Sequence, residues 1–125
     1  MNGTLIFDGK CGMCTRSRDL VVRMDRHGRV AAVPLQRPGT AEWLGVTPQA
    51  LAESAWWLDA SGELYRGAEA VNATLSAAIG SRLPLMVYRL PGIRQIQDAV
   101  YRWVSTHRHR LPGTTPYCRS HPTEC

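Results

Sequence analysis

Apolar and polar positions follow strand and helix periods along the chain, and they predict its elements in order. The apolar run at residues 3–7 predicts a first strand. Apolar positions at helical spacing then predict a helix from about Cys11 to His27 that ends at Gly28. A second strand is expected at residues 29–33, parallel to the first through a right-handed crossover, which gives a βαβ unit. The side chains expected on the buried face of this helix are Met13, Ser17, Leu20, Val21 and Met24.

The middle of the chain changes to short helical pieces and then to an extended pattern. Residues 40–44 and 47–53 are expected to form two short helices. Residues 54–58 and 63–66, joined by a tight turn, predict a β-hairpin, and a helix over 68–79 follows it. The order βαβ, then ββα, predicts an α/β fold of the thioredoxin-like type, with a mixed four-stranded sheet.

A helical extension is expected after this unit. Two segments, 82–90 and 91–108, have helical spacing, and an apolar stripe on the second is expected to pack on the domain. The stripe consists of Ile93, Ile96, Val100, Trp103 and Val104. Residues 111–125 contain three prolines and no periodicity, so they are expected to form a flexible tail. One domain over 1–110, followed by the tail, is therefore predicted.

Composition and charge narrow the class of protein. Hydrophobic content of 44% and charged content of 20% are typical of a folded soluble chain. No targeting segment is visible, so a cytoplasmic location is expected. The excess of five positive charges lies mostly after residue 88, on a basic C-terminal helix that could contact an anionic membrane surface peripherally. A solvated arginine-rich surface is the simpler interpretation, and nucleic acid is not favoured because no RNA-binding signature accompanies the charge.

The candidate chemistry lies between the first strand and the first helix, in Asp8-Gly9-Lys10-Cys11-Gly12-Met13-Cys14. A cysteine at a helix start tends to ionise, because unpaired N–H groups and the helix dipole favour an anion there. The C-x-x-C spacing puts both sulfurs on one side of the first turn, where they can form a disulfide. The same spacing can hold zinc, but the chain has no matching second pair.

The Asp8-Gly9-x-Cys11-x-x-Cys14 motif after an N-terminal strand resembles the DCC family of thiol-disulfide oxidoreductases, named for its Asp-Cys-Cys signature. Weaker landmarks of the resemblance are Val33-Pro34-Leu35-Gln36, Asp59-Ala60-Ser61-Gly62, Tyr65-Arg66-Gly67-Ala68-Glu69-Ala70, Tyr101-Arg102 and Arg108. The resemblance implies a thioredoxin-like fold and an enzyme that reduces or exchanges disulfides. It implies no cofactor beyond a redox-active Cys11–Cys14 disulfide. The expected partner is a disulfide-containing protein or a low-molecular-weight thiol.

Within this motif each residue has an expected role. Cys11, as a thiolate, attacks a substrate disulfide, and Cys14 then resolves the mixed disulfide. Asp8 could accept a proton from Cys14 during resolution, or it could cap the helix and fix the turn, and both roles stay open. The residues expected to contact substrate or tune the thiol pKa are Gly9, Lys10, Gly12 and Met13.

Two other classes of function compete with the enzyme. One is a zinc-binding domain, in which the C-x-x-C pair would need further ligands from Cys118, Cys125, His107, His109 or His121. The other is a non-catalytic thioredoxin-like adaptor, which would be distinguished from an enzyme by reactive thiols without turnover. Cys118 and Cys125 are expected to be exposed thiols, with Cys118 as an alternative redox partner. Thioredoxin's docking proline is also absent, since the junction before the third strand has the sequence Ala52-Glu53-Ser54-Ala55.

Overall fold

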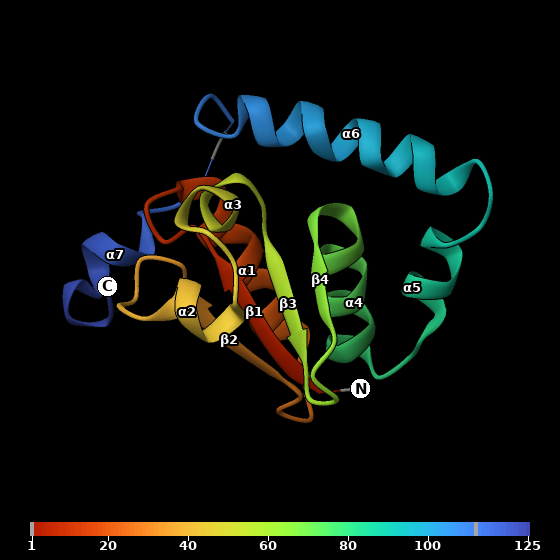
Figure 1. Ribbon diagram of the computed structural model, residues 1–125, viewed down its shortest axis with the longest axis horizontal. Helices are drawn as coiled ribbons and strands as arrows, with labels where there is room; N and C mark the ends of the chain where they lie inside the picture. The colour runs from red at the N-terminus through yellow and green to blue at the C-terminus, as the bar shows by residue number, and fades with distance from the viewer. Residues whose placement is uncertain (1, 112) are drawn as a thin grey trace.

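A mixed four-stranded sheet forms the centre of the computed structural model, which describes residues 2–111 and 113–125 (Figure 1). The strands are β1 (Gly3–Phe7), β2 (Val30–Pro34), β3 (Trp56–Asp59) and β4 (Leu64–Arg66). Their order is β2-β1-β3-β4, with β1 parallel to β2 and the other pairs antiparallel. The predicted βαβ-ββα arrangement is confirmed.

Helices cover both faces of this sheet. They are α1 (Gly12–Met24), α2 (Thr40–Leu44), α3 (Pro48–Glu53), α4 (Gly67–Ile79), α5 (Leu83–Tyr88), α6 (Ile93–His107) and α7 (Tyr117–Ser120), followed by the 3-10 turn η1 (Pro122–Glu124). In Figure 1, α1 lies behind the sheet, α2 lies in front of it, and α6 crosses above α4. No helix within the described residues is long and apolar enough to cross a membrane.

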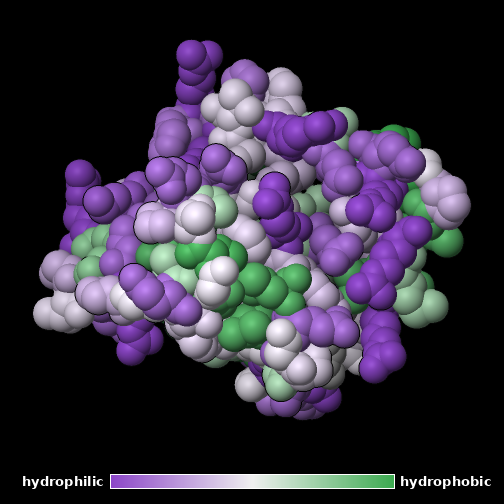
Figure 2. Space-filling model, viewed as in Figure 1, coloured by the Kyte–Doolittle hydropathy of each residue, from purple (hydrophilic) through white to green (hydrophobic). Residues whose placement is uncertain are grey.

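Two cores result from the alternation of side chains along the central strand β1. Leu5 and Phe7 point to one face, where they pack with Trp57 and with four alanines of α4. Ile6 points to the other face and packs with Leu51 and Trp56 beneath α2 and α3. Figure 2 shows apolar side chains gathered in the middle of this second face, over the strands beside α2. Because β1 is buried on both faces, its whole sequence can be apolar.

The first helix differs from the prediction in its length and in its buried face. α1 ends at Met24, three residues early, because the Asp25 carboxylate accepts the N–H groups of Arg29 and Val30 at 2.9 Å each. Ser17 and Leu20 are exposed, not buried as predicted. Thr15 is buried instead. Arg18 is also half-buried, with its guanidinium 5.1 Å from the ring of Tyr117.

The apolar stripe of α6 does not pack tightly on the domain, which corrects the prediction. Ile96, Val100 and Trp103 are 62%, 56% and 57% exposed, and no residue of α6 is buried. Polar contacts hold the helix instead: the Tyr101 hydroxyl accepts the Ala55 N–H at 2.8 Å, and the Tyr88 hydroxyl donates to Asp98 at 2.7 Å. Helical spacing shows that a stripe shares one face but not how closely that face is covered.

The C-terminal segment also differs from the expected flexible tail. Residues 113–125 contain α7 and η1, and Tyr117 is buried with its ring edge-on to Phe7, 5.2 Å between centroids. Cys118 and Cys125 form a disulfide, so the prediction of two exposed thiols is wrong. Tyr117 anchors this stretch on the domain, and a single aromatic residue produces no periodic pattern in the sequence.

Candidate functional site

Cys11 occupies the N-cap of α1, at the end of the turn that follows β1. Its backbone is extended (φ −101°, ψ 121°), and its Sγ accepts the N–H of Cys14 at 3.2 Å. A serine, threonine or aspartate oxygen usually fills this position. Here the sulfur receives one of the helix's unpaired N–H donors.

Cys14 lies one turn into the helix and behaves differently. Both cysteines are free thiols, but Cys14 is only half-buried. Burial, followed by its hydrogen bond to Cys11 and the charge of Cys11, raises the pKa of the Cys14 thiol to about 12, while Arg108 opposes the rise. The pair therefore consists of a sulfur that accepts hydrogen bonds and a thiol that keeps its proton.

Access to the two sulfurs is also unequal. Cys11 is only 1% exposed, whereas Cys14 lines a hollow between α1, α4 and α6 with a volume of about 500 Å³. The C-terminal segment lies against the residues that flank Cys11. Thr114 N–H donates to the Gly12 carbonyl at 3.2 Å, and Cys118 N–H donates to the Gly9 carbonyl at 2.9 Å. The expected nucleophile is thus the covered member of the pair.

Gly9 and Gly12 are the positions that let this segment approach. A Cβ on Gly12 would lie 2.5 Å from the Thr114 carbonyl oxygen, and one on Gly9 would lie 2.5 Å from the Cys118 sulfur. Any larger side chain at either position would push the segment away. At both glycines, the chain's own C-terminal segment therefore comes close to the backbone.

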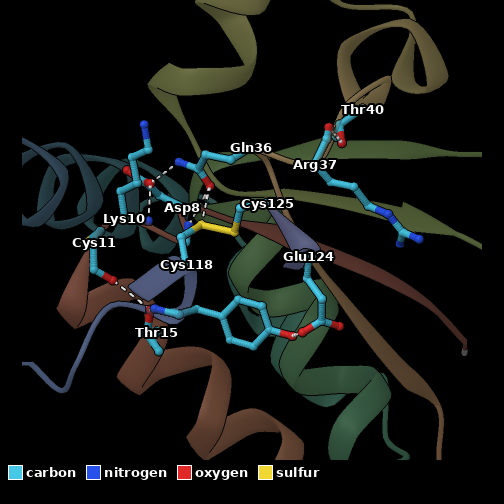
Figure 3. The surroundings of a disulfide bond; sticks show 12 residues. Asp8, Lys10, Cys11, Thr15, Gln36, Arg37, Thr40, Cys118, Glu124 and Cys125 are labelled. Carbon is cyan, nitrogen blue, oxygen red and sulfur yellow. Dashed lines mark hydrogen bonds between the residues drawn. A yellow bond between two sulfur atoms is a disulfide. The ribbon is translucent and has the colours of Figure 1, made fainter. Parts of the chain in front are cut away.

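Thr15 ties the same segment to α1. Its hydroxyl donates to the Cys11 carbonyl at 2.9 Å and accepts the Tyr117 N–H at 3.0 Å (Figure 3). The sequence analysis did not assign a role to this residue. Its position one turn after Cys11 is the only sequence signal that it faces the site.

Asp8 is fully engaged by donors at the carboxyl end of β1. Its Oδ1 accepts the Lys10 N–H at 3.0 Å and Gln36 Nε2 at 2.7 Å (Figure 3). Its Oδ2 lies 3.1 Å from Arg108 Nη2. These contacts favour the turn-fixing role among the two that the sequence leaves open. Proton transfer from Cys14 to Asp8 stays a prediction.

Gln36 and Arg108 belong to this site, although the sequence analysis treated them only as family landmarks. Gln36 also accepts the Gly9 N–H through Oε1 at 2.9 Å, so it clamps both ends of the Asp8-Gly9 turn. The position of Gln36 could have been predicted from the sequence. β1 and β2 are parallel with Phe7 beside Pro34, so the residues that follow the two strands lie close together. Arg108 follows α6 and comes from the far end of the chain, so no local pattern connects it to Asp8.

The remaining predicted site residues lie at the edge. Lys10 is exposed, and Figure 3 shows its side chain extending away from Cys11, so its expected effect on the thiolate has no support from this geometry. Met13 is half-buried and lines the hollow beside Cys14.

A metal centre is not assembled by the described parts of the chain. Residues 2–111 and 113–125 contain no group of three or more His, Cys, Asp or Glu side chains placed to hold an ion. Cys118 and Cys125, which were considered as further zinc ligands, form a disulfide with each other.

Comparison with known proteins gives one match. A family model described as DCC1-like thiol-disulfide oxidoreductase covers residues 5–114, which include Asp8, both free cysteines, Gln36 and Arg108. The Cys118–Cys125 disulfide lies beyond the matched residues. No curated protein and no solved structure matches the chain.

Proposed function

Because the chain belongs to the DCC1-like thiol-disulfide oxidoreductase family, we propose that Cys11 and Cys14 carry out its thiol–disulfide exchange as a dithiol pair. The observation that carries the proposal is the asymmetry at the start of α1. Cys11 Sγ accepts the Cys14 N–H, while the raised pKa of Cys14 keeps that thiol protonated. Such a pair has one sulfur suited to attack a disulfide and one thiol that stays protonated until the mixed disulfide has formed.

The first step is attack by Cys11. Its thiolate bonds to one sulfur of a substrate disulfide, the substrate S–S bond breaks, and one half leaves as a thiol after taking up a proton. The negative charge on Cys11 is then gone. The charge of Cys11, one of the causes that raise the pKa of Cys14, disappears with it, while burial, the largest cause, and the opposing Arg108 remain.

The second step is resolution by Cys14. Cys14 then loses its proton and attacks Cys11 Sγ, which breaks the mixed disulfide, and the substrate half that leaves as a thiolate takes up a proton to become a thiol. The products are a Cys11–Cys14 disulfide and two substrate thiols, so two electrons pass from the protein to the substrate. An external dithiol or thiol pair would return the protein to its reduced form by the reverse exchange.

The test uses the different roles of the two thiols. We expect Cys14→Ser to accumulate mixed disulfides with bis(2-hydroxyethyl) disulfide at Cys11, because the first step is intact and the second is blocked. Cys11→Ser should form no adduct at this motif. Both variants are also made with Cys118 and Cys125 replaced by serine, so that no other thiol can resolve the adduct. Peptide mass spectrometry locates each adduct.

The outcomes separate the enzyme from the alternatives. Adducts formed equally by both variants would show that the two positions have no defined roles. Folded, reduced protein that forms no adduct in either variant would contradict the proposal and favour a non-catalytic adaptor.

The proposed compartment is the cytosol. Its thiol pool would hold Cys11 and Cys14 reduced, so that the protein acts as a reductant. The Cys118–Cys125 disulfide is of a kind more usual in oxidising compartments. Acid quenching of intact cells, followed by alkylation and mass spectrometry, would report the state of both pairs, and a fully oxidised Cys11–Cys14 pair would contradict the cytosolic proposal.

A further inference from the structure

Thiol chemistry alone does not explain the hollow beside Cys14. It lies between α1, α4 and α6 and has a volume of about 500 Å³, within the usual range of small-molecule sites. Most of its wall is aliphatic, including Leu20 and Val21 of α1, Leu75 of α4, and Ile96, Val100 and Val104 of α6.

These apolar side chains line the hollow without filling it. Leu20, Ile96 and Val100 are each more than half exposed. Polar contacts along α6 fix it above α4: Asn72 Nδ2 donates to Gln97 Oε1 at 2.7 Å, and Arg108 reaches Asp8. The contacts hold the helix in place while its apolar face stays open, as a preformed binding site requires.

The hollow has a direction that is set by α6. Ile96 and Arg108 are twelve residues apart, which is about 18 Å along a helix. Arg108 contacts Asp8 and influences the pKa of Cys14, so the dithiol lies at the Arg108 end. The aliphatic residues extend from there toward Ile96.

Several polar groups in the wall are paired within the protein, although the buried Arg18 Nε, also in the wall, has no hydrogen-bond partner among the described residues. Asn72 donates to the Ala68 carbonyl and to Gln97, and the Tyr101 hydroxyl accepts the Ala55 N–H. Asp8 is held by Arg108 and Gln36. The wall surface that stays open to a ligand is mainly apolar.

We propose that this hollow binds the apolar body of a low-molecular-weight disulfide and presents its sulfurs to the dithiol at the Cys14 end, where Cys11 Sγ lies 3.2 Å from the Cys14 backbone nitrogen. The proposal rests on the proposed function and names its substrate class. The step is the exchange already written: the substrate R–S–S–R′ gains two electrons and two protons and leaves as RSH and R′SH, while Cys11 and Cys14 become a disulfide. The hollow's volume and mainly apolar wall suit an alkyl chain of small-molecule size.

The test compares disulfides that differ only in alkyl length. Methyl, butyl and hexyl 2-hydroxyethyl disulfides are reacted with the reduced full chain, and loss of the Cys11 and Cys14 thiols is timed by acid quench and mass spectrometry. A synthetic peptide of residues 8–16 corrects for intrinsic reactivity. Transfer of each methylene from water should raise the corrected rate about two- to fourfold, so the hexyl probe, with five more methylenes, should exceed the methyl probe by about thirtyfold or more.

A matched pair of substitutions locates the effect. Ile96→Asp places a charge in the hollow, and Met86→Asp places one on α5, outside it; the two side chains are 62% and 60% exposed, so neither change should unfold the protein. The hexyl-to-methyl ratio should fall about fivefold or more in Ile96→Asp and should not change in Met86→Asp. Circular dichroism checks that both variants are folded.

A non-reactive ligand separates failure of this proposal from failure of the proposed function. Hexyl 2-hydroxyethyl sulfide cannot exchange, and its binding is followed by NMR shifts of the Val100 and Leu75 methyl groups. Binding of the sulfide without any exchange would keep the site and overturn the dithiol function. Equal rates for all three disulfides, with no sulfide binding, would overturn the site and keep the function. Faster reaction with an apolar peptide disulfide than with the hexyl probe would overturn the small-molecule assignment.

Discussion

Two cysteine pairs meet at the turn after β1, and they are in opposite states. Cys11 and Cys14 are free thiols one helical turn apart, and Cys118 and Cys125 form a disulfide in the C-terminal segment. The first pair sits where a helix supplies N–H donors to sulfur, so one member can carry charge. The second closes a short loop and holds a segment against Gly9. One pair is placed for reaction, while the other restrains the chain.

The largest expected difference between the pairs is in turnover. Cys11→Ser should abolish reduction of bis(2-hydroxyethyl) disulfide, because no other sulfur takes its place at the N-cap of α1. The Cys118→Ser/Cys125→Ser double variant should keep most of the activity. A coupled assay that regenerates the dithiol measures both. Loss of activity in the double variant, with the fold intact, would make the second pair part of the reaction.

Stability should show the reverse ranking. The Cys118–Cys125 bond closes a loop of eight residues, and the chain-entropy account gives such a loop about 2–3 kcal/mol. The double variant should lose up to this much free energy of unfolding in urea. Cys11→Ser should lose less, because serine keeps the capping geometry. Equal losses would mean that both pairs are structural.

How much of the difference between the two cysteine pairs could be predicted depends on how local the sequence pattern is that places each pair. The βαβ unit and the C-x-x-C site follow from short-range patterns: an apolar strand, a break at Asp8-Gly9, and a helix start at Cys11. The second pair could not be placed in the same way, because it depends on Tyr117 packing against Phe7, 110 residues away in the sequence. Arg108 was missed for the same reason.

The apolar stripe of α6 shows a second limit of prediction from the sequence. Its spacing correctly predicts a helix with one apolar face. What that face meets depends on polar contacts from other elements, such as Asn72 to Gln97, which hold the helix above the hollow. A stripe that lines a hollow and a stripe that closes a core have the same sequence pattern.

A smaller effect is expected where the two pairs meet, at Gly12. An alanine Cβ there would lie 2.5 Å from the Thr114 carbonyl and should displace the segment that covers Cys11. Alkylation of Cys11 by iodoacetamide should then become severalfold faster, although alanine suits the helix itself. Gly28→Ala is the control, because its cost is backbone strain at φ 65° with nothing near its Cβ. An unchanged rate in Gly12→Ala would show that the segment does not limit access to Cys11.

The smallest effect concerns the pH dependence of stability. Burial, followed by the hydrogen bond to Cys11, raises the pKa of Cys14 from 9.0 to about 12, so the folded state favours the protonated thiol. Its contribution to stability is complete below pH 9, where both states are protonated. It is lost as the pH rises from 9 toward 12, because the unfolded chain then releases a proton that the folded chain keeps. The slope is at most about 1.4 kcal/mol per pH unit, and solvent screening of a half-buried group reduces it.

Urea unfolding from pH 8 to 10.5 isolates this contribution by difference. The free energy of unfolding should fall less steeply with pH in Cys14→Ala than in the unchanged chain, since tyrosines and other titrating groups are common to both. The Cys118→Ser/Cys125→Ser variant should keep the steeper slope, because a disulfide does not titrate and its removal leaves Cys14 in place. Parallel curves for Cys14→Ala and the unchanged chain would mean that Cys14 ionises equally easily in both states, and the protonated thiol on which resolution depends would then have no basis.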